Sequence, residues 1–253
     1  MKVSHLFLCL LIALISGCQS SSKAQLEMDQ KRAKLQYQIG VDALHKNQMP
    51  KAFQSLIKSN EIYPNQPEVL DALAYAWRVR GDLVQAEDYY KQALHAGAGA
   101  TTHTNYGSLL VSQGRYAEAE KELRQALTDP SYNRQFVAFV NLGDALAGLK
   151  QYDGAVMNYR KAGLLQPRSS LPALKEARVY KESGRLDYAA SLYETLLRSD
   201  PADQVVLADY LELLKAQHDS STARKFLNDF RGQVQDAPQK IWASEQLKSV
   251  SKW

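Results

Sequence analysis

The sequence lacks the residue patterns that catalysis and metal binding require. Its 253 residues include five histidines, none of which stands at metal-ligand spacing from another histidine, a cysteine or a carboxylate. The glycine-rich stretch Gly97-Ala98-Gly99 follows no expected strand and precedes no Gly-Lys-Ser or Gly-Lys-Thr, and there is no Gly-x-Ser-x-Gly motif. We therefore expect no enzyme activity, no cofactor, no metal and no small-molecule substrate.

A basic stripe is also missing. The formal net charge is +4, and the cations are spread along the chain apart from one small cluster at Lys31, Arg32 and Lys34. Proteins that bind nucleic acid concentrate positive charge and interleave it with aromatic side chains. We interpret the cluster as a solvated helix start and expect no nucleic-acid partner.

What the sequence does contain is an alanine that recurs with an almost constant period. The successive gaps are 34, 33, 36, 34 and 34 residues, and the six positions are Ala52, Ala86, Ala119, Ala155, Ala189 and Ala223. A period near 34 residues is typical of tetratricopeptide repeats, in which each unit is a helix A, a turn and a helix B. The sequence predicts an all-α superhelix of six such repeats.

Other positions keep the same phase. Eleven or twelve residues before each alanine, where helix A meets helix B, stand Gly40, Ala74, Gly107, Gly143, Ala177 and Leu211. Four residues after it stand Leu56, Tyr90, Leu123, Tyr159, Tyr193 and Leu227, and seven residues after it Ser59, Ala93, Ala126, Ala162, Leu196 and Phe230. The turns between helices carry Gly81, Gly114 and Gly184, since glycine suits the left-handed residue after a helix end. Proline ends three units, at Pro64, Pro167 and Pro201.

The phase also predicts boundaries. We expect repeats at about 33–66, 67–99, 100–135, 136–169, 170–203 and 204–237, with a turn-rich insertion around Asp129-Pro130-Ser131-Tyr132-Asn133. Residues 238–253 follow as a helix and tail that cover the last apolar face, as the ends of repeat arrays require. Each repeat touches only its neighbours, so we expect the six to form one continuous array.

The amino terminus resembles a bacterial lipoprotein signal. Leu6 to Ile15 is an unbroken apolar run, too short to span a bilayer. It leads into Ile15-Ser16-Gly17-Cys18, which resembles a lipobox. We expect a signal peptide over residues 1–17, lipidation at Cys18, and a tether over residues 18–32 that is flexible at Ser20–Lys23. Cys9 would be discarded with the signal, which leaves one cysteine and no internal disulfide. The alternative is an ordinary signal or retained anchor with a chance cysteine.

A partner-binding groove is expected on helix A of the first two repeats. Helix A lines the concave face of such arrays, and the apolar content there is densest at Tyr37, Val41, Leu44, Tyr75 and Val79. The first three share one helix face at spacing i, i+4, i+7, and we expect them to point away from the core. An apolar groove suits an amphipathic helix or an extended peptide. The alternative is that residues 23–33 fold back and cover this groove.

The third repeat resembles a known family. The resemblance rests on Asn105-Tyr106-Gly107, Gly114-Arg115-Tyr116, Ala126-Leu127-Thr128-Asp129-Pro130-Ser131-Tyr132 and Asn141-Leu142-Gly143. This series is similar to that of the type IV pilus biogenesis and stability lipoproteins, the secretin pilotins known as PilF or PilW. The similarity extends to the lipobox, the six repeats and the total length. One departure is Ser108-Leu109-Leu110, where the family often has Phe-Leu-Cys.

The resemblance implies a function and a location. A pilotin binds secretin subunits in the periplasm, brings them to the outer membrane and promotes their assembly into a ring. Gln19 after the lipidated cysteine implies, by similarity to bacterial lipoproteins, export to the outer membrane. The alternative function is a general periplasmic adaptor lipoprotein that tethers cell-wall hydrolases or assists outer-membrane protein assembly.

The lipid anchor can be tested directly. The variant Cys18→Ala should lose acylation, because the thiol that would carry the acyl chains is gone, and should stay at the inner membrane or become soluble in the periplasm. Metabolic labelling with palmitate measures this, with the wild-type chain as the control. Palmitate label on the Cys18→Ala protein would contradict lipidation at this cysteine.

Overall fold

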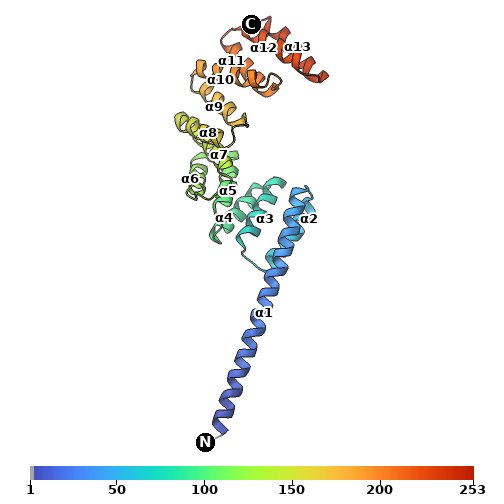
Figure 1. The fold of residues 1–253 in the computed structure, drawn as a ribbon, viewed down its shortest axis with the longest axis vertical. Helices are drawn as coiled ribbons and strands as arrows, with labels where there is room; N and C mark the ends of the chain where they lie inside the picture. Colours follow the sequence, from blue (N-terminus) through green and yellow to red (C-terminus); the bar gives the residue numbers. More distant parts are fainter. Residues whose placement is uncertain (1–2) are drawn as a thin grey trace. The chain divides into compact units, whose positions relative to one another are not determined.

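The computed structural model describes the backbone of residues 3–253 and the side chains of residues 23–253. It divides into two compact units, one that extends to Leu109 and one from Leu110 to Trp253. Figure 1 colours them from blue to green and from green to red. Each unit is described below by itself.

The described backbone contains thirteen helices and no strand, in agreement with the all-α prediction. The N-terminal unit contains α1 (Val3–His45), α2 (Met49–Ile62), α3 (Pro67–Arg80), α4 (Leu83–His95) and most of α5 (Ala100–Ser112), whose last residues belong to the C-terminal unit. The C-terminal unit contains α6 (Tyr116–Ala126), α7 (Gln135–Gly148), α8 (Tyr152–Leu165), α9 (Leu171–Glu182), α10 (Leu186–Ser199), α11 (Gln204–Ala216), α12 (Ser220–Gln233) and α13 (Ala237–Val250). Odd numbers up to α11 are helices A and even numbers are helices B.

Helix α1 differs from the expected amino terminus. It runs without a break from Val3 to His45, so the segment Ser20–Lys23, expected as a flexible tether, is helical. The side chains of the expected signal and of Cys18 lie outside those that the structure describes. Within the described part of the chain, no helix has an apolar stretch long enough to cross a membrane.

The six alanines of the repeat pattern are all completely buried. Each lies on helix B where it crosses helix A, and the glycines on helix A show how close this crossing is. A Cβ atom added at Gly40 would lie 2.6 Å from Leu56 Cγ, and one at Gly143 would lie 2.3 Å from Tyr159 Cε1. Because these distances are far below van der Waals contact, the small residues on helix A are a steric requirement of the fold.

One core position is polar for a local reason. Ser59 stands where most other repeats carry an apolar residue, and it is fully buried. Its hydroxyl donates a 2.8 Å hydrogen bond to the backbone carbonyl of Ala33. Since a buried hydroxyl without a partner is destabilising, this bond explains why serine is tolerated and ties α2 to α1.

The turn between helices A and B has the same backbone conformation in all six repeats. The predicted glycines, Gly81, Gly114 and Gly184, have φ of 92°, 73° and 77°. Asn47, Lys150 and His218 occupy the equivalent turns of the first, fourth and sixth repeats, with φ of 55°, 60° and 57°. The repeat geometry therefore imposes a left-handed residue even at Lys150, whose side chain does not favour it, whereas asparagine adopts this region more readily.

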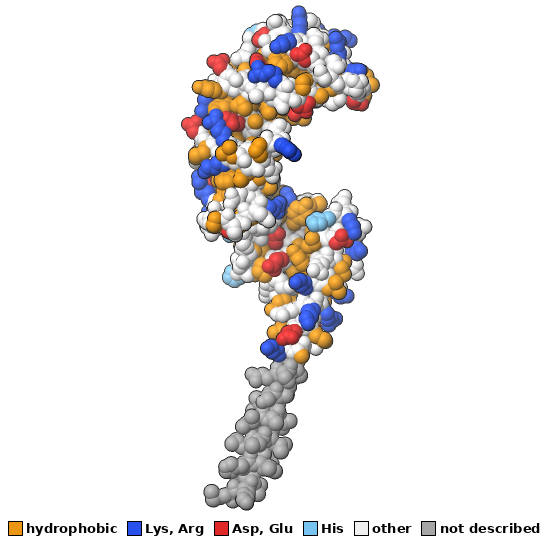
Figure 2. Space-filling model, viewed as in Figure 1, with side chains coloured by type: hydrophobic (Ala, Val, Ile, Leu, Met, Phe, Trp, Pro, Cys, Tyr) orange, Lys and Arg blue, Asp and Glu red, His pale blue; other side chains and the backbone are white. Residues whose placement is uncertain are grey.

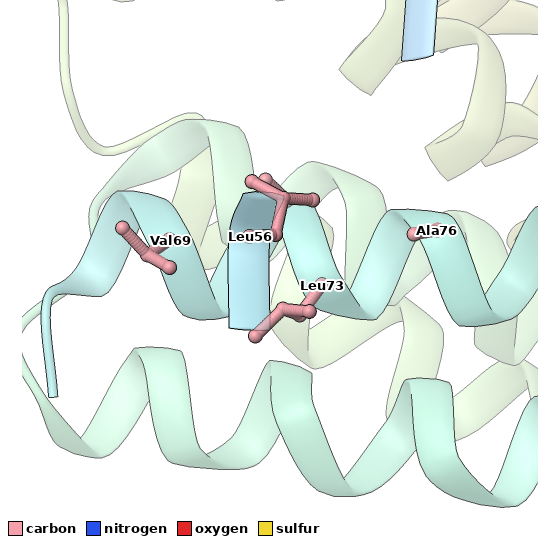
Figure 3. Packing of buried hydrophobic residues seen from close by; sticks show 5 residues of the cluster. Leu56, Val69, Leu73 and Ala76 are labelled. Atoms are coloured by element: carbon pink, nitrogen blue, oxygen red, sulfur yellow. The ribbon is translucent and has the colours of Figure 1, made fainter. Parts of the chain in front are cut away.

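The N-terminal unit has a compact apolar cluster where α2 meets α3. Figure 3 shows Leu56 of α2 beside Val69, Leu73 and Ala76 of α3, all buried. Phe53 packs against this cluster and also meets Trp77 edge to face at 4.7 Å between ring centroids. Helices of successive repeats thus share one continuous core, as the repeat pattern predicts.

The C-terminal end closes as expected. Trp242 of α13 packs edge to face on Phe230 of α12 at 5.4 Å, and Ala243 and Val250 are buried. These contacts cover the apolar side of α12. Helix α13 therefore acts as the predicted capping helix.

The insertion between α6 and α7 is also present. Asp129 accepts hydrogen bonds from the backbone N–H and the hydroxyl of Ser131, at 2.8 and 2.6 Å. These bonds hold the pKa of the Asp129 carboxyl below its ordinary value. Tyr132 is buried, so the insertion is anchored on the core.

The close crossing of helices A and B provides a stability test. Ala155→Asp should lower the free energy of unfolding by roughly several kcal/mol, because it buries an unpaired carboxylate in a contact without room for it. Hydrogen exchange should report lost protection in α7 and α8, with damage that fades over the adjacent repeats. Unchanged protection in α8 would contradict the burial of Ala155.

Candidate functional site

The five predicted groove residues all lie in the N-terminal unit. Tyr37, Val41 and Leu44 come from α1, and Tyr75 and Val79 come from α3. We call the surface formed by these five side chains the inner face. Helices α1 and α3 pack against each other, so the three residues of α1 and the two residues of α3 lie on adjacent helices.

The inner-face residues of α1 and those of α3 differ in exposure. Tyr75 and Val79 are 37% and 48% exposed. Tyr37, Val41 and Leu44 are half-buried and pack against the cluster of Leu56, Val69 and Leu73. The expectation that the α1 residues point away from the core is therefore wrong. The cause is α3 of the next repeat, which covers the side of α1 that a single repeat would leave open.

The alternative that residues 23–33 cover this surface is also wrong in this structure. These residues continue the straight course of α1, and the side chains of residues 23–28 are exposed. A chain that folded back would have to break the helix and bury some of those side chains. The exposed part of the inner face is therefore open.

Acidic groups border the inner face. Burial raises the pKa of the Tyr37 hydroxyl above its ordinary value, and the negative charges of Glu68 and Asp71 raise it further. Asn105 of α5 donates to both carboxylate oxygens of Asp71 at 3.2 Å. This bond links the inner side of α5 to that of α3. A basic group is also present, since the Arg78 guanidinium lies 5.1 Å from the centre of the Tyr75 ring.

Two buried polar atoms behind this surface have no partner. Among the described residues, the Tyr90 hydroxyl and Arg78 Nε are buried and make no hydrogen bond of good geometry, although the two side chains lie close enough for Arg78 to lower the pKa of Tyr90. Burial raises the pKa of Tyr90, the charge of Asp71 raises it further and that of Arg78 lowers it, so the hydroxyl lies near the inner side of α3. Unpaired buried donors are rare in proteins. Both atoms are closed off from solvent, so they belong to the core behind the inner face.

Sequence reasoning missed this role of Tyr90. Its phase, four residues after the recurring alanine, predicts a core position, and the residue is fully buried. The missing signal was that tyrosine, unlike leucine at the same position, carries a hydroxyl that extends past helix A. Tyr159 in the fourth repeat shows the same reach, since its hydroxyl donates to Asp144 at 2.8 Å.

The corresponding side of the C-terminal unit is ionic and internally paired. Asp144 of α7 accepts from Lys175 of α9 at 2.8 Å, and Lys181 of α9 donates to Glu212 of α11 at 2.8 Å. Arg178 and Asp209 form a third ion pair between α9 and α11. We call these three pairs the ionic ladder. In these pairs the charges of each side chain face an opposite charge of a neighbouring repeat, which joins helices A of successive repeats.

No metal centre is apparent in the part of the chain with described side chains. No group of three or more His, Cys, Asp or Glu side chains there is arranged to hold a metal ion.

The comparisons with known proteins agree with the fold. Residues 51–101 and 105–163 match the family model of the tetratricopeptide repeat. The chain is 28% identical over 130 residues to an uncharacterized protein of Haemophilus influenzae, which covers 51% of this chain and 72% of that protein. It is 26% identical over 187 residues to cellulose synthase operon protein C of Pseudomonas fluorescens. This alignment covers 69% of this chain and 15% of that protein.

Two solved structures are similar over most of the chain. The structure of PilF from Pseudomonas aeruginosa matches with a TM-score of 0.68 and 23% identity, over 86% of this chain and 99% of that chain. The structure of PilW, a widely conserved type IV pilus biogenesis factor, matches with a TM-score of 0.74 and 20% identity, over 86% and 97%. At these identities the likeness shows the fold. The all-α fold of tetratricopeptide repeats is confirmed.

The unpaired Tyr90 hydroxyl leads to a testable consequence. Tyr90→Phe should raise the free energy of unfolding by up to about 1 kcal/mol, because it removes a buried polar group that has no hydrogen bond. Denaturant unfolding measures the change, and Tyr159→Phe is the matched control that loses a real hydrogen bond and should destabilise. A clear loss of stability in Tyr90→Phe would contradict the unpaired state of its hydroxyl.

Proposed function

We propose that this chain is a lipid-anchored scaffold of type IV pilus biogenesis, a pilotin that binds secretin subunits and promotes their outer-membrane localisation and multimer assembly. The coarser part of this statement rests on the fold: a tetratricopeptide-repeat protein structurally similar to type IV pilus biogenesis factors. The finer part rests on the motif series of the third repeat and on the lipobox.

The inner face of the N-terminal unit is the observation that carries the proposal. It combines exposed apolar and aromatic side chains, Val79 and Tyr75, with the half-buried guanidinium of Arg78 beside the Tyr75 ring. Apolar contact and a few well-placed polar groups together characterise sites that bind a peptide or an amphipathic helix. An unassembled secretin subunit exposes apolar surface and strand edges that aggregate unless covered.

Binding on the inner face has a defined chemistry. An apolar side chain of the partner lies against Tyr75 and Val79. A backbone carbonyl or another uncharged acceptor of the partner lies against the half-buried guanidinium of Arg78. A carboxylate suits this place less well, because the charge of Asp71 reaches the Tyr90 hydroxyl.

The ionic ladder confines this chemistry to one unit. Its side chains already pair across α7, α9 and α11, so an apolar segment bound there would cover paired charges instead of apolar side chains. Partial separation of such pairs leaves charges uncompensated, which is unfavourable where they are partly buried. The same inner positions therefore bind a partner in the N-terminal unit and hold the repeats together in the C-terminal unit.

The anchor gives the scaffold its location. Two or more acyl chains hold a protein stably at a membrane, whereas one holds it only marginally. With acyl chains on Cys18, the repeats would face the periplasm at the outer membrane. A secretin subunit bound to the inner face would be carried to that membrane by the sorting signal of its partner.

The test uses α3 rather than α1. Val41→Glu with Leu44→Glu would disturb the core that these side chains cover, so a loss of function would be ambiguous. Tyr75→Glu with Val79→Glu changes exposed side chains and should abolish detergent-resistant secretin multimers, because carboxylates there oppose burial against an apolar segment. A gel of those multimers is the readout, together with circular dichroism and membrane fractionation of the variant.

Val84→Glu is the matched control, since Val84 is an exposed valine of α4 outside the inner face. It should leave the multimers unchanged. Normal multimers with a folded Tyr75→Glu, Val79→Glu protein would contradict the use of the inner face. Failure of the wild-type chain to bind purified secretin subunits would contradict the pilotin role itself and favour the general adaptor.

A further inference from the structure

One acidic side chain on the inner side of the N-terminal unit lacks the cation that such side chains have in the C-terminal unit. In the ionic ladder every carboxylate is paired with a lysine or arginine of a neighbouring helix A. Lys175, for example, donates to both oxygens of Asp144 at 2.8 and 3.0 Å. Glu68, in the first turn of α3, forms no ion pair with any residue in the described part of the chain. Its charge is therefore available to a group from outside the chain.

Glu68 lies in line with the exposed residues of the inner face. It stands seven residues before Tyr75 and eleven before Val79, and these spacings place the three side chains on one side of α3. All three are exposed, and Figure 2 shows acidic side chains beside hydrophobic ones on the visible face of the N-terminal unit. Glu68 and Tyr75 are about 10 Å apart along the helix axis. A segment that covers Tyr75 and follows α3 for two further turns therefore reaches Glu68.

The charges around Glu68 favour a cation. Asp71 follows one turn later, and both carboxylates are close enough to the Tyr37 hydroxyl to raise its pKa. Lys34 occupies the equivalent position of α1, but its side chain is exposed and forms no ion pair with Glu68. Arg78, the cation of the inner face, lies ten residues from Glu68, near the other end of α3. A lysine or arginine of a partner is attracted to the first turn of α3, whereas a carboxylate is repelled there.

Helix α3 by itself offers another reason for an acidic residue at this position. A negative charge in the first turn interacts favourably with the helix dipole. The repeat architecture does not require it, because none of the equivalent residues of the other five repeats is acidic: Lys34, Thr101, Val137, Leu171 and Val205. The two roles of Glu68 predict different results, since the interaction with the helix dipole does not depend on the charge of a partner.

We propose that Glu68 selects the partner of the inner face: the bound segment carries a lysine or arginine that pairs with Glu68, about 10 Å from the apolar side chain that contacts Tyr75. This rests on the proposed function, because it takes the inner face as the binding surface. The partner's cation occupies beside Glu68 the place that Lys175 occupies beside Asp144. Such a pair at the edge of an interface contributes mainly to specificity and to the rate of association.

The first experiment measures the binding of purified secretin subunits to the full chain in detergent. Glu68→Lys should weaken binding by at least about tenfold, because it sets like charges against one another under the bound segment. Glu68→Gln should weaken binding by a smaller factor and make it less sensitive to salt, since the interaction that salt screens is gone. Glu61→Lys makes the same change of charge at an exposed residue of α2 outside the inner face and should leave the affinity unchanged.

The second experiment reverses the charge of the partner. Each lysine and arginine of the secretin subunit is changed to glutamate in turn. One of these changes should weaken binding to the wild-type chain and restore binding to the Glu68→Lys chain, because opposite charges then face each other again. A residue that serves only the dipole of α3 cannot produce this recovery. Circular dichroism of both Glu68 variants should show an intact fold, as the side chain is exposed.

The results distinguish selection by Glu68 from the proposed function. A wild-type chain that does not bind secretin subunits contradicts both. Equal binding by the wild-type and Glu68→Lys chains overturns selection by Glu68 and leaves the inner face as the binding surface. Weaker binding by Glu68→Lys that no charge reversal on the subunit recovers also overturns it, and assigns Glu68 to the stability of the amino end of α3.

Discussion

The structure depends on the close crossing of helix A over helix B in every repeat. Gly143 shows the limit of this approach, because a single added Cβ atom would lie 2.3 Å from the Tyr159 ring. Only a small residue on helix A lets the fully buried alanine of helix B reach its place. The crossing decides which sides of each helix are consumed by the core, and so also which sides remain for partners: the inner side of helix A and the outer side of helix B.

The tyrosines at the crossing connect the core with the inner surface. Tyr90, Tyr159 and Tyr193 fill equivalent places with their rings, and in the fourth repeat Asp144 accepts the Tyr159 hydroxyl. The hydroxyls of Tyr90 and Tyr193 have no partner among the described residues. In the second repeat the residue equivalent to Asp144 is Tyr75, which leaves the Tyr90 hydroxyl unpaired next to an exposed aromatic surface. A single difference on helix A thus decides whether this hydroxyl has a carboxylate partner within the repeat.

The two units use one architecture for different purposes. In the C-terminal unit, ion pairs such as Lys175–Asp144 and Lys181–Glu212 join helices A of successive repeats. In the N-terminal unit, apolar contacts by Val41 and Leu44 do the same work against α3. In the N-terminal unit, Tyr75 and Val79 remain as exposed apolar side chains beside these contacts. In the C-terminal unit, the corresponding side consists of paired charges. In the C-terminal unit the exposed large apolar side chains include Met157 and Leu164 of α8.

The sequence by itself determined the periodic features, because their causes lie within one repeat. The buried alanines, the small residues on helix A, the left-handed turn glycines and the capping helix were all predictable. Local sequence could not show that Asn47, Lys150 and His218 adopt the same left-handed turn, since only the closure of the repeat forces it. Nor could it rank the groove residues: Val41 and Leu44 are covered by α3, while Tyr75 and Val79 are not. The ionic ladder, the unpaired Tyr90 hydroxyl and the unpaired carboxylate of Glu68 were decided only by tertiary structure, because each depends on side chains brought together by the packing of separate helices.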